Sequence, residues 1–203
     1  MAVMPLSAAQ EASVGEVLCA AFRDYPVMRF ILGEDVSYDE RLAILVGLFV
    51  SARILRGEPM LGIADPTGGL AAAAILSLPG EQPPPPALVA RREAVFAALG
   101  EDARRRYEAF GAAAGRFPVA APHHHLNMIG VRPAAQGRGH GRHLLEAAHA
   151  LAAADAASTG VSLTTEVAAN VELYRHFGYA VLGETRVAPG LITWSCYRPH
   201  GRA

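Results

Sequence analysis

Two spacings of apolar residues alternate along the chain and predict a mixed order of helices and strands. Apolar residues three or four positions apart predict helices at residues 8–22, 38–55, 87–99, 102–114, 139–154 and 170–176. Short apolar runs bounded by turn residues predict strands at residues 2–4, 60–64, 70–78, 124–131, 161–167, 179–184 and 191–198. The late strand–helix–strand unit predicts one right-handed parallel crossover.

Residue types at the helix ends support two of these helices. Ser7 and Gln10 have the spacing of a capping box, in which the serine side chain caps the first turn and the glutamine reaches back. Asn170 is expected to cap the last helix, and Gly178 to end it.

The segment from about residue 80 to 122 differs from the rest. Four prolines, Pro83 to Pro86, predict a stiff polyproline spacer, and the two helices that follow include a run of three arginines. This segment is too short to bury a core of its own. We therefore expect a proline-rich helical insertion within a single domain that spans residues 1–203.

Composition and charge narrow the classes of function. The chain has 203 residues, of which 52% are hydrophobic, and a formal net charge of -1 without any lysine, so no basic face for nucleic acid is expected. Cys19 and Cys196 match no metal-site spacing, which indicates reduced thiols in a cytoplasmic protein. No leader pattern or membrane-spanning apolar run is present, so no membrane partner is expected. The oligomeric state, monomer or homodimer, stays open.

A glycine-rich stretch joins the strand at 124–131 to the helix at 139–154. Gly137, Gly139 and Gly141 occupy every second position, so successive backbone N–H groups can point at one anion beside the positive end of the helix dipole. The stretch lacks the Lys-Ser or Lys-Thr of a Walker loop, and its glycine spacing differs from that of the dinucleotide fingerprint. Its geometry predicts a phosphate site of another kind.

This stretch resembles the acyl-CoA signature of the GNAT superfamily of N-acetyltransferases, Gln/Arg-x-x-Gly-x-Gly/Ala, which is present as Gln136-Gly137-Arg138-Gly139-His140-Gly141 after Val131-Arg132-Pro133. A second family landmark is matched in shortened form by Asn170, Leu173-Tyr174 and Phe177-Gly178-Tyr179. The resemblance implies a mixed α/β fold with a central twisted sheet of six to seven strands and helices on both faces.

The resemblance also implies acetyl-CoA as the acyl donor. Its pyrophosphate is expected on the loop, its pantetheine arm along the strand edge at Ile129 and Val131, and a strand N–H near Ile129 on the thioester carbonyl. Asn170 is expected to hydrogen-bond the pantetheine. The expected donor-binding residues are Ile129, Val131, Gln136, Gly137, Arg138, Gly139, His140, Gly141, Arg142 and Asn170.

Acid–base chemistry follows the family pattern only in part. Tyr174 is the expected general acid for the departing thiolate. Many family members carry a glutamate on the central strand where this chain has Asn127, an amide that takes no proton at neutral pH. His125, on the same face of the strand, is the first candidate base, and Glu166 at the end of the next strand is the second.

The run His123 to His125 raises the question of a metal site. Consecutive strand residues alternate between the two faces, so all three histidines cannot bind one ion, and no metal is expected.

The resemblance predicts an enzyme that moves an acetyl group to a primary amine of a small molecule by direct attack in a ternary complex. Phe22, Tyr25, Phe30 and Asn127 are expected to contribute to the acceptor pocket. Two alternatives stay open: a catalytically silent acyl-CoA sensor, and an enzyme that acetylates a protein or peptide amine. A nucleotide enzyme is disfavoured by the glycine spacing.

Overall fold

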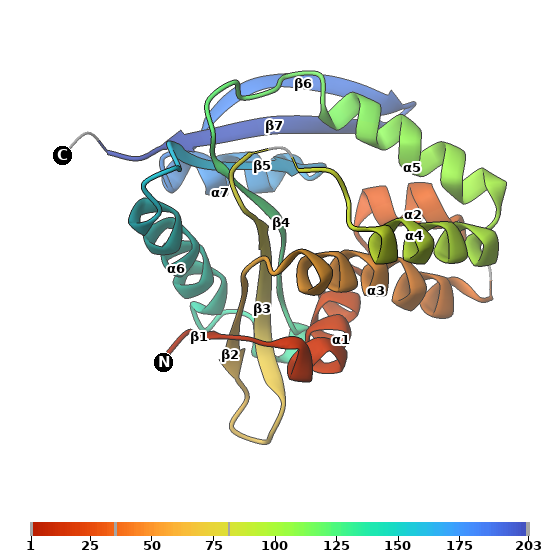
Figure 1. Cartoon of the computed structure of the whole chain (residues 1–203), viewed down its shortest axis with the longest axis horizontal. Coiled ribbons are helices and arrows are strands. Elements are labelled where there is room, and N and C mark those ends of the chain that lie inside the picture. The colour runs from red at the N-terminus through yellow and green to blue at the C-terminus, as the bar shows by residue number, and fades with distance from the viewer. Residues whose placement is uncertain (1, 35, 81, 202–203) are drawn as a thin grey trace.

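One mixed sheet organises the computed structural model, which describes residues 2–34, 36–80 and 82–201 (Figure 1). Within these residues the sheet has seven strands in the order β1-β2-β3-β4-β5-β7-β6. The strands are β1 (Met4–Pro5), β2 (Met60–Ala64), β3 (Leu70–Ser77), β4 (His124–Val131), β5 (Gly160–Thr165), β6 (Ala180–Ala188) and β7 (Leu191–Pro199). Neighbours are antiparallel except β4 and β5, which are parallel.

Helices cover both faces of this sheet, as expected. They are α1 (Glu11–Phe22), α2 (Pro26–Leu32), α3 (Tyr38–Arg56), α4 (Pro86–Leu99), α5 (Glu101–Ala114), α6 (His140–Ala154) and α7 (Ala168–His176), with 3-10 turns η1 (Ala8–Gln10) and η2 (Pro133–Ala135). Residues of α1 to α5 form one apolar cluster, and residues of α6 and α7 form a second with the other face of the sheet. The two helices of the proline-rich segment share the first cluster through Leu88, Phe96 and Ala103.

Side chains of the central strands alternate between these clusters until a β-bulge interrupts β4. On β3, Ile75 packs in the first cluster and Leu76 in the second, as a regular pleat requires. On β4, Leu126 and Met128 are two residues apart but face opposite clusters. The cause is the register, which pairs Ile75 with Met128 and Leu76 with Leu126 and leaves Asn127 as the extra residue.

The parallel pair of β4 and β5 is short, and its separation opens the sheet (Figure 1). Only His124 and His125 of β4 pair with β5. Arg132 N–H donates to the carbonyl of Ala71 at 2.9 Å, on the β3 side. Because the backbone groups of a strand alternate in direction, Ile129 and Val131 direct theirs away from β3, into the gap. The centre of the sheet therefore has an unpaired backbone edge.

Of the two predicted helix caps, the one at Ser7 is confirmed and the one at Asn170 is wrong. The capping box is confirmed, because Ser7 Oγ accepts from Ala9 N–H at 3.3 Å and Gln10 Oε1 accepts from Ser7 N–H at 2.8 Å. The prediction that Asn170 caps the last helix is wrong. Asn170 lies inside α7, which begins at Ala168, and its side chain is used elsewhere.

We predict that Gly130→Ala destabilises the protein. A Cβ at this position on β4 would lie 2.7 Å from Ala21 Cβ and 3.2 Å from Leu18 Cδ2, so α1 has to move away. A loss of about 1–3 kcal/mol is expected from such overpacking, measured by urea unfolding. Gly47→Ala in α3 is the control, because nothing lies within 4 Å of its Cβ and alanine favours a helix. Equal stability of the two variants contradicts this account.

Candidate active site

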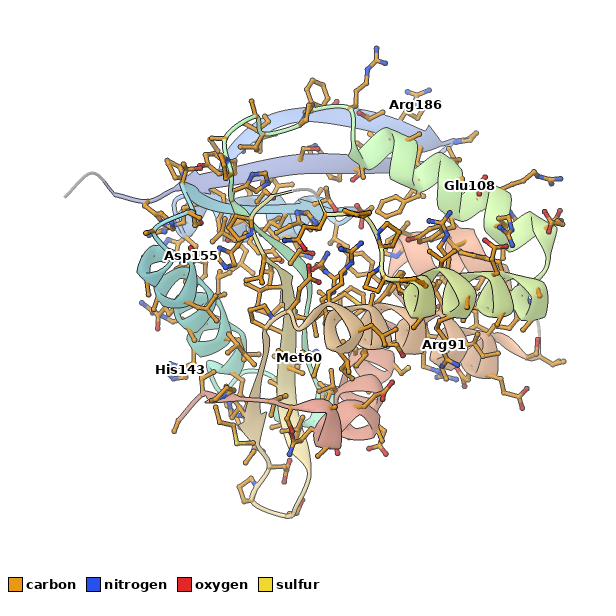
Figure 2. All side chains as sticks on the ribbon, viewed as in Figure 1. Met60, Arg91, Glu108, His143, Asp155 and Arg186 are labelled. Atoms are coloured by element: carbon orange, nitrogen blue, oxygen red, sulfur yellow. The ribbon has the colours of Figure 1, made fainter. Side chains whose placement is uncertain are left out.

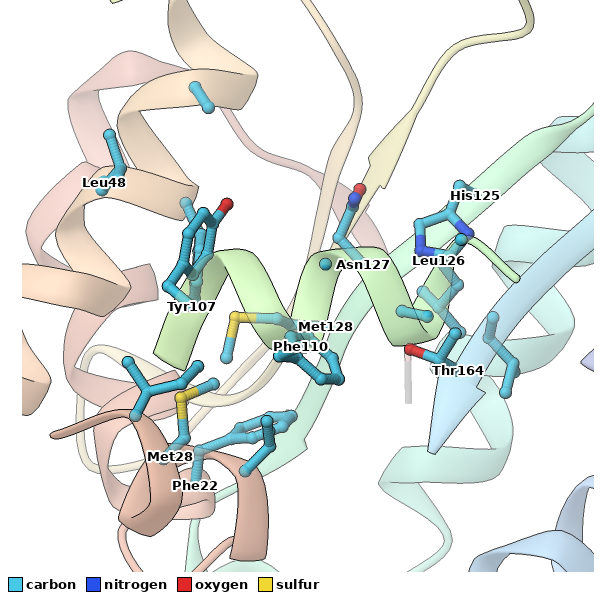
Figure 3. A pocket seen from close by; sticks show the side chains of 18 of the residues that line it. Phe22, Met28, Leu48, Tyr107, Phe110, His125, Leu126, Asn127, Met128 and Thr164 are labelled. Atoms are coloured by element: carbon cyan, nitrogen blue, oxygen red, sulfur yellow. The ribbon is translucent and has the colours of Figure 1, made fainter. Parts of the chain in front are cut away.

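A cavity of about 960 Å³ lies where β4 and β5 separate, and α1 to α5 and α7 complete its walls (Figure 3). Its apolar lining includes Phe22, Met28, Phe49, Tyr107, Phe110 and Met128. Its polar lining includes Arg53, His125, Asn127, Glu166, Asn170 and Tyr174. The cavity thus gathers four of the sequence candidates for chemistry and cofactor contact in one place: Tyr174, His125, Glu166 and Asn170.

Glu166 is a buried carboxylic acid at the end of β5. Its side chain accepts a hydrogen bond from Thr193 Oγ1 at 2.7 Å, and the residue is 8% exposed. Burial raises the pKa of Glu166 to about 7, and the hydrogen bonds from Thr193 and Tyr25 oppose that rise. A group with this pKa can both take and release a proton at neutral pH.

A hydrogen-bond network fixes the residues beside Glu166. Tyr25, which precedes α2, has its hydroxyl 2.9 Å from Thr165 Oγ1 and accepts from the backbone N–H of Glu166 at 3.1 Å. Asn170 Nδ2 donates to the same Thr165 oxygen at 3.3 Å. Burial raises the pKa of Tyr25 to about 12, so its hydroxyl keeps its proton. Helix α7 and the loop before α2 are thereby joined at the end of β5.

Tyr174 of α7 has a different environment. It is 9% exposed, and its ring meets that of Tyr179 in a T-shaped contact with the centroids 5.6 Å apart. Burial raises the pKa of Tyr174 well above its ordinary value. Its hydroxyl has no hydrogen-bond partner within the described residues, although the residue lines the cavity. It is therefore a protonated donor with no structural bond to maintain.

His125 and Asn127 point to the same side of β4 (Figure 3). His125 Nδ1 lies 2.8 Å from Ser162 Oγ, and burial, followed by the charges of His123 and Arg53, lowers the pKa of His125 to about 4. Asn127 Oδ1 accepts from Arg53 Nη1 at 2.6 Å and from Ser77 Oγ at 3.1 Å. His125 is thus a neutral imidazole at physiological pH, and the side chain of the bulge residue is held in place.

The glycine loop lies beyond the end of β4 and is exposed. Gly137 and Gly139 have φ of 75° and 80°, a left-handed conformation that side chains disfavour. Helix α6 starts at His140 without a side-chain cap, so its first N–H groups stay available for an anion. No atom lies within 4 Å of a Cβ built on Gly137, so the loop leaves room for a phosphate. The loop has room and backbone donors for a pyrophosphate, and the unpaired edge of β4 has backbone groups that can pair with an extended arm, the two parts of an acyl-CoA.

The side chains around this loop differ in their availability. Gln136 Nε2 donates to the carbonyl of Val131 at 3.3 Å and so ties the loop to the strand. Arg142 is paired with Glu146 at 2.8 Å, whereas exposed Arg138 makes no ion pair with a described residue. His140 is buried, with its Nδ1 atom unbonded. Arg138 is therefore the arginine that can most easily turn to a phosphate.

Not every expected residue lies at the cavity. Phe30 packs against the first apolar cluster and does not line the cavity, whereas Phe22 and Tyr25 do. Arg53, Thr165 and Thr193 contribute to the site without having been singled out in the sequence. Of these three residues, only Arg53 could have been recognised from the sequence, because it is a charged residue on the apolar side of the helix predicted at residues 38–55.

The described residues contain neither a cluster of metal ligands nor a helix that could span a membrane. The described residues hold no group of three or more His, Cys, Asp or Glu side chains placed to bind a metal ion. The consecutive histidines His124 and His125 contact different serines, since His124 Nδ1 lies 3.1 Å from Ser158 Oγ and His125 Nδ1 lies 2.8 Å from Ser162 Oγ. None of the described helices combines the length and apolar character needed to span a bilayer.

Comparison with known proteins gives the family. The family model of the acetyltransferase (GNAT) domain matches residues 89–181, which include β4, the glycine loop, β5 and α7. The chain carries a GNAT acetyltransferase domain. A search of curated proteins by sequence finds no match for this GNAT chain.

Solved structures show that the GNAT fold extends over the whole chain. The structure of histone acetyltransferase HPA2 and related acetyltransferase from Corynebacterium glutamicum has a TM-score of 0.73 and 21% identity, covering 99% of this chain and 97% of that one. Arylalkylamine N-acetyltransferase 2 from Aedes aegypti has a TM-score of 0.64 and 13% identity, covering 97% and 96%. Naa20 from Chaetomium thermophilum, solved with a bisubstrate analogue, has a TM-score of 0.55 and 16% identity, covering 98% and 86%. The expected family and fold are confirmed.

We predict that Tyr174→Phe leaves the stability of this GNAT domain within about 0.5 kcal/mol of wild type, because the lost hydroxyl has no partner among the described residues. Tyr179→Phe is the matched variant. It removes a hydroxyl that lies 2.9 Å from His149 Nε2, so a loss of about 1 kcal/mol is expected. Thermal unfolding of both variants measures the difference. A large loss in Tyr174→Phe would show that its hydroxyl has a structural role.

Proposed function

We propose that this protein transfers an acetyl group from acetyl-CoA to a primary amine of a small molecule, by direct attack in a ternary complex. The observation that carries the proposal is the early separation of β4 from β5, which leaves the backbone groups of Ile129 and the N–H of Val131 without a strand partner, beside an uncapped helix N-terminus. An extended pantetheine arm pairs with such an edge as an added strand does.

The donor is held mainly by backbone groups. The N–H groups from Gly137 to Gly141 receive the pyrophosphate with Arg138, and Asn170 contacts the pantetheine arm. Ile129 N–H polarises the thioester carbonyl and stabilises the oxyanion that forms when the amine attacks. Because these groups belong to the end of β4 and the start of α6, which are rigid, they hold the donor in one position.

Glu166 and Tyr174 divide the proton transfers between them. The amine nitrogen bonds to the thioester carbon, and Glu166 takes the proton that the nitrogen loses, directly or through a water. The carbon–sulfur bond then breaks, and the Tyr174 hydroxyl gives its proton to the departing thiolate. We place Glu166 ahead of His125 as the base, because a carboxyl with a pKa of about 7 accepts protons better than an imidazole with a pKa of about 4.

A small acceptor is favoured over a protein because α4 and α5 wall the cavity from outside. The neighbours include both arylalkylamine and Naa20 acetyltransferases, so a peptide amine stays the alternative. The silent sensor is disfavoured by the pairing of Glu166 and Tyr174 in one cavity.

Binding of acetyl-CoA tests the site, with calorimetric titration of the wild type and of Gly141→Asp. The added carboxylate lies in the first turn of α6, where it suits the helix dipole but repels a pyrophosphate. We expect the Kd for acetyl-CoA to rise by at least about tenfold without loss of thermal stability.

Gly141→Ala is the control, because its Cβ would make only an ordinary contact, 3.8 Å from Val131 Cγ2. ATP and NADH, titrated against the wild type, should bind far more weakly than acetyl-CoA. Unchanged affinity in Gly141→Asp, or equal affinity for the three ligands, contradicts the proposed donor site.

The pH dependence of turnover tests the base. Because only the ionised form of Glu166 accepts a proton, kcat/KM should rise as the pH increases through about 7, after correction for ionisation of the acceptor amine. Glu166→Gln should remove this limb and lower kcat by about 10²-fold or more. His125→Gln should keep it. Loss of the limb in His125→Gln, with retention in Glu166→Gln, assigns the base to the histidine instead.

A further inference from the structure

Three arginines lie along one side of the cavity and have no role in the proposed transfer. Arg53 and Arg56 come from the last turn of α3, and Arg92 comes from α4. The Tyr107 hydroxyl and the Asn127 side chain point to one side of the cavity, and Phe22 and Met28 lie at the other (Figure 3). The cavity is thus amphipathic, with a cationic side and an apolar side.

Arg53 is the innermost of these cations, with a side chain that is 12% exposed. Its Nε lies 2.9 Å from Glu58 Oε2, and its Nη1 donates to Asn127 Oδ1 at 2.6 Å and to Ser77 Oγ. Its other terminal nitrogen, Nη2, bonds to none of the described residues and is not among the fully buried polar atoms. A single ion pair therefore leaves one face of the guanidinium open to a ligand.

The described carboxylates around the cavity form no ion pair with the other two arginines. Glu93 is bound to Arg104 at 2.8 Å, and Glu108 lies exposed at the rim. Neither Arg56 nor Arg92 forms an ion pair with a described residue; Arg56 donates only to the carbonyl of Gln82. Arg56 and Arg92 therefore keep guanidinium donors that no described carboxylate holds in an ion pair.

Tyr107 connects Arg53 with Arg92. Burial raises the pKa of Tyr107, and the positive charges of Arg92 and Arg53 oppose that rise, so both guanidiniums act on the Tyr107 hydroxyl. Its ring is held by Phe96, with the centroids 5.0 Å apart, and by Phe49 at 6.1 Å. The guanidiniums of Arg53 and Arg92 and the hydroxyl of Tyr107, whose ring is fixed, therefore form a set of donors suited to a carboxylate.

Arg53 also lies near the proposed position of the thioester carbonyl at Ile129. Asn127, which contacts Arg53, is two strand residues from Ile129, a distance of about 7 Å along β4. An anion on Arg53 therefore lies within the length of a small molecule from the thioester carbonyl.

We propose that the acceptor is a small amine that also carries a carboxylate and an apolar side chain, as an apolar amino acid does, with the carboxylate held by Arg53, Arg92 and the Tyr107 hydroxyl. The inference rests on the proposed function and specifies its substrate class. A purely structural role for Arg53 accounts for its bond to Glu58, but it gives no reason for two further unpaired arginines on the same side.

Matched pairs of amines test the inference. Phenylalanine with phenethylamine, and leucine with 3-methylbutylamine, differ only by the carboxylate, and phenylalanine amide keeps the size without the charge. Thiol release from acetyl-CoA measures kcat/KM, corrected for the fraction of free amine. We expect each amino acid to exceed its decarboxylated partner and the amide by at least about tenfold.

Arg92→Gln should raise the KM of the amino acids by about three- to tenfold, with little change in kcat or in the affinity for acetyl-CoA. Arg91→Gln is the control, because Arg91 is also exposed on α4 (Figure 2) but does not line the cavity. Equal or better use of the decarboxylated amines overturns the carboxylate inference and leaves the proposed function standing. Transfer to neither set, together with no binding of acetyl-CoA, overturns both.

Discussion

The structure depends on one constraint: a parallel strand pair cannot be closed by a short turn, so β4 and β5 are joined through α6 and are free to diverge. They share two residue pairs and then separate. Everything proposed for the site uses the space that results. The unpaired backbone of β4 offers hydrogen bonds to an extended donor, the crossover helix presents its N-terminus at the end of the gap, and the far end of β5 carries Glu166 into the cavity.

The bulge at Asn127 adds a second consequence to this separation. It turns Met128 toward the helical cluster of α1 to α5, so that β4 contributes an apolar wall where the strand leaves its partner. Asn127 itself is held by Arg53 and Ser77 from the neighbouring elements α3 and β3. A carboxylate at this position would sit against the buried guanidinium of Arg53, and such an ion pair would keep its pKa low. The amide of Asn127 cannot accept the proton, and the proposed base, Glu166, is a buried carboxyl with a pKa of about 7.

Sequence patterns predicted the elements well where both ends carry a local signal. The strands at Met60–Ala64 and His124–Val131 have the expected bounds, and the glycine loop lies before α6 as expected. Properties that depend on register could not be predicted this way. The bulge at Asn127, the bond between Thr193 and Glu166, and the exclusion of Phe30 from the cavity each require knowledge of which distant segments lie side by side. The assignment of Asn170 as a cap failed for a related reason, because its side chain bonds to Thr165 on the strand before the helix.

The same distinction explains why the glycine loop could be predicted from the sequence and the lining of the cavity could not. A phosphate loop is built from consecutive backbone groups, so its geometry can be predicted from the glycine spacing of one segment. The cavity draws single side chains from α1 to α5, β4, β5 and α7, and each of these elements must also bury an apolar face. Where many elements contribute to one wall, the residues that best indicate a binding site are polar ones on an otherwise apolar face. Their hydrogen-bonding groups are not all paired within the protein. Arg53 fits that description: it lies on the buried side of α3, pairs with one carboxylate, and keeps one terminal nitrogen unbonded within the described residues.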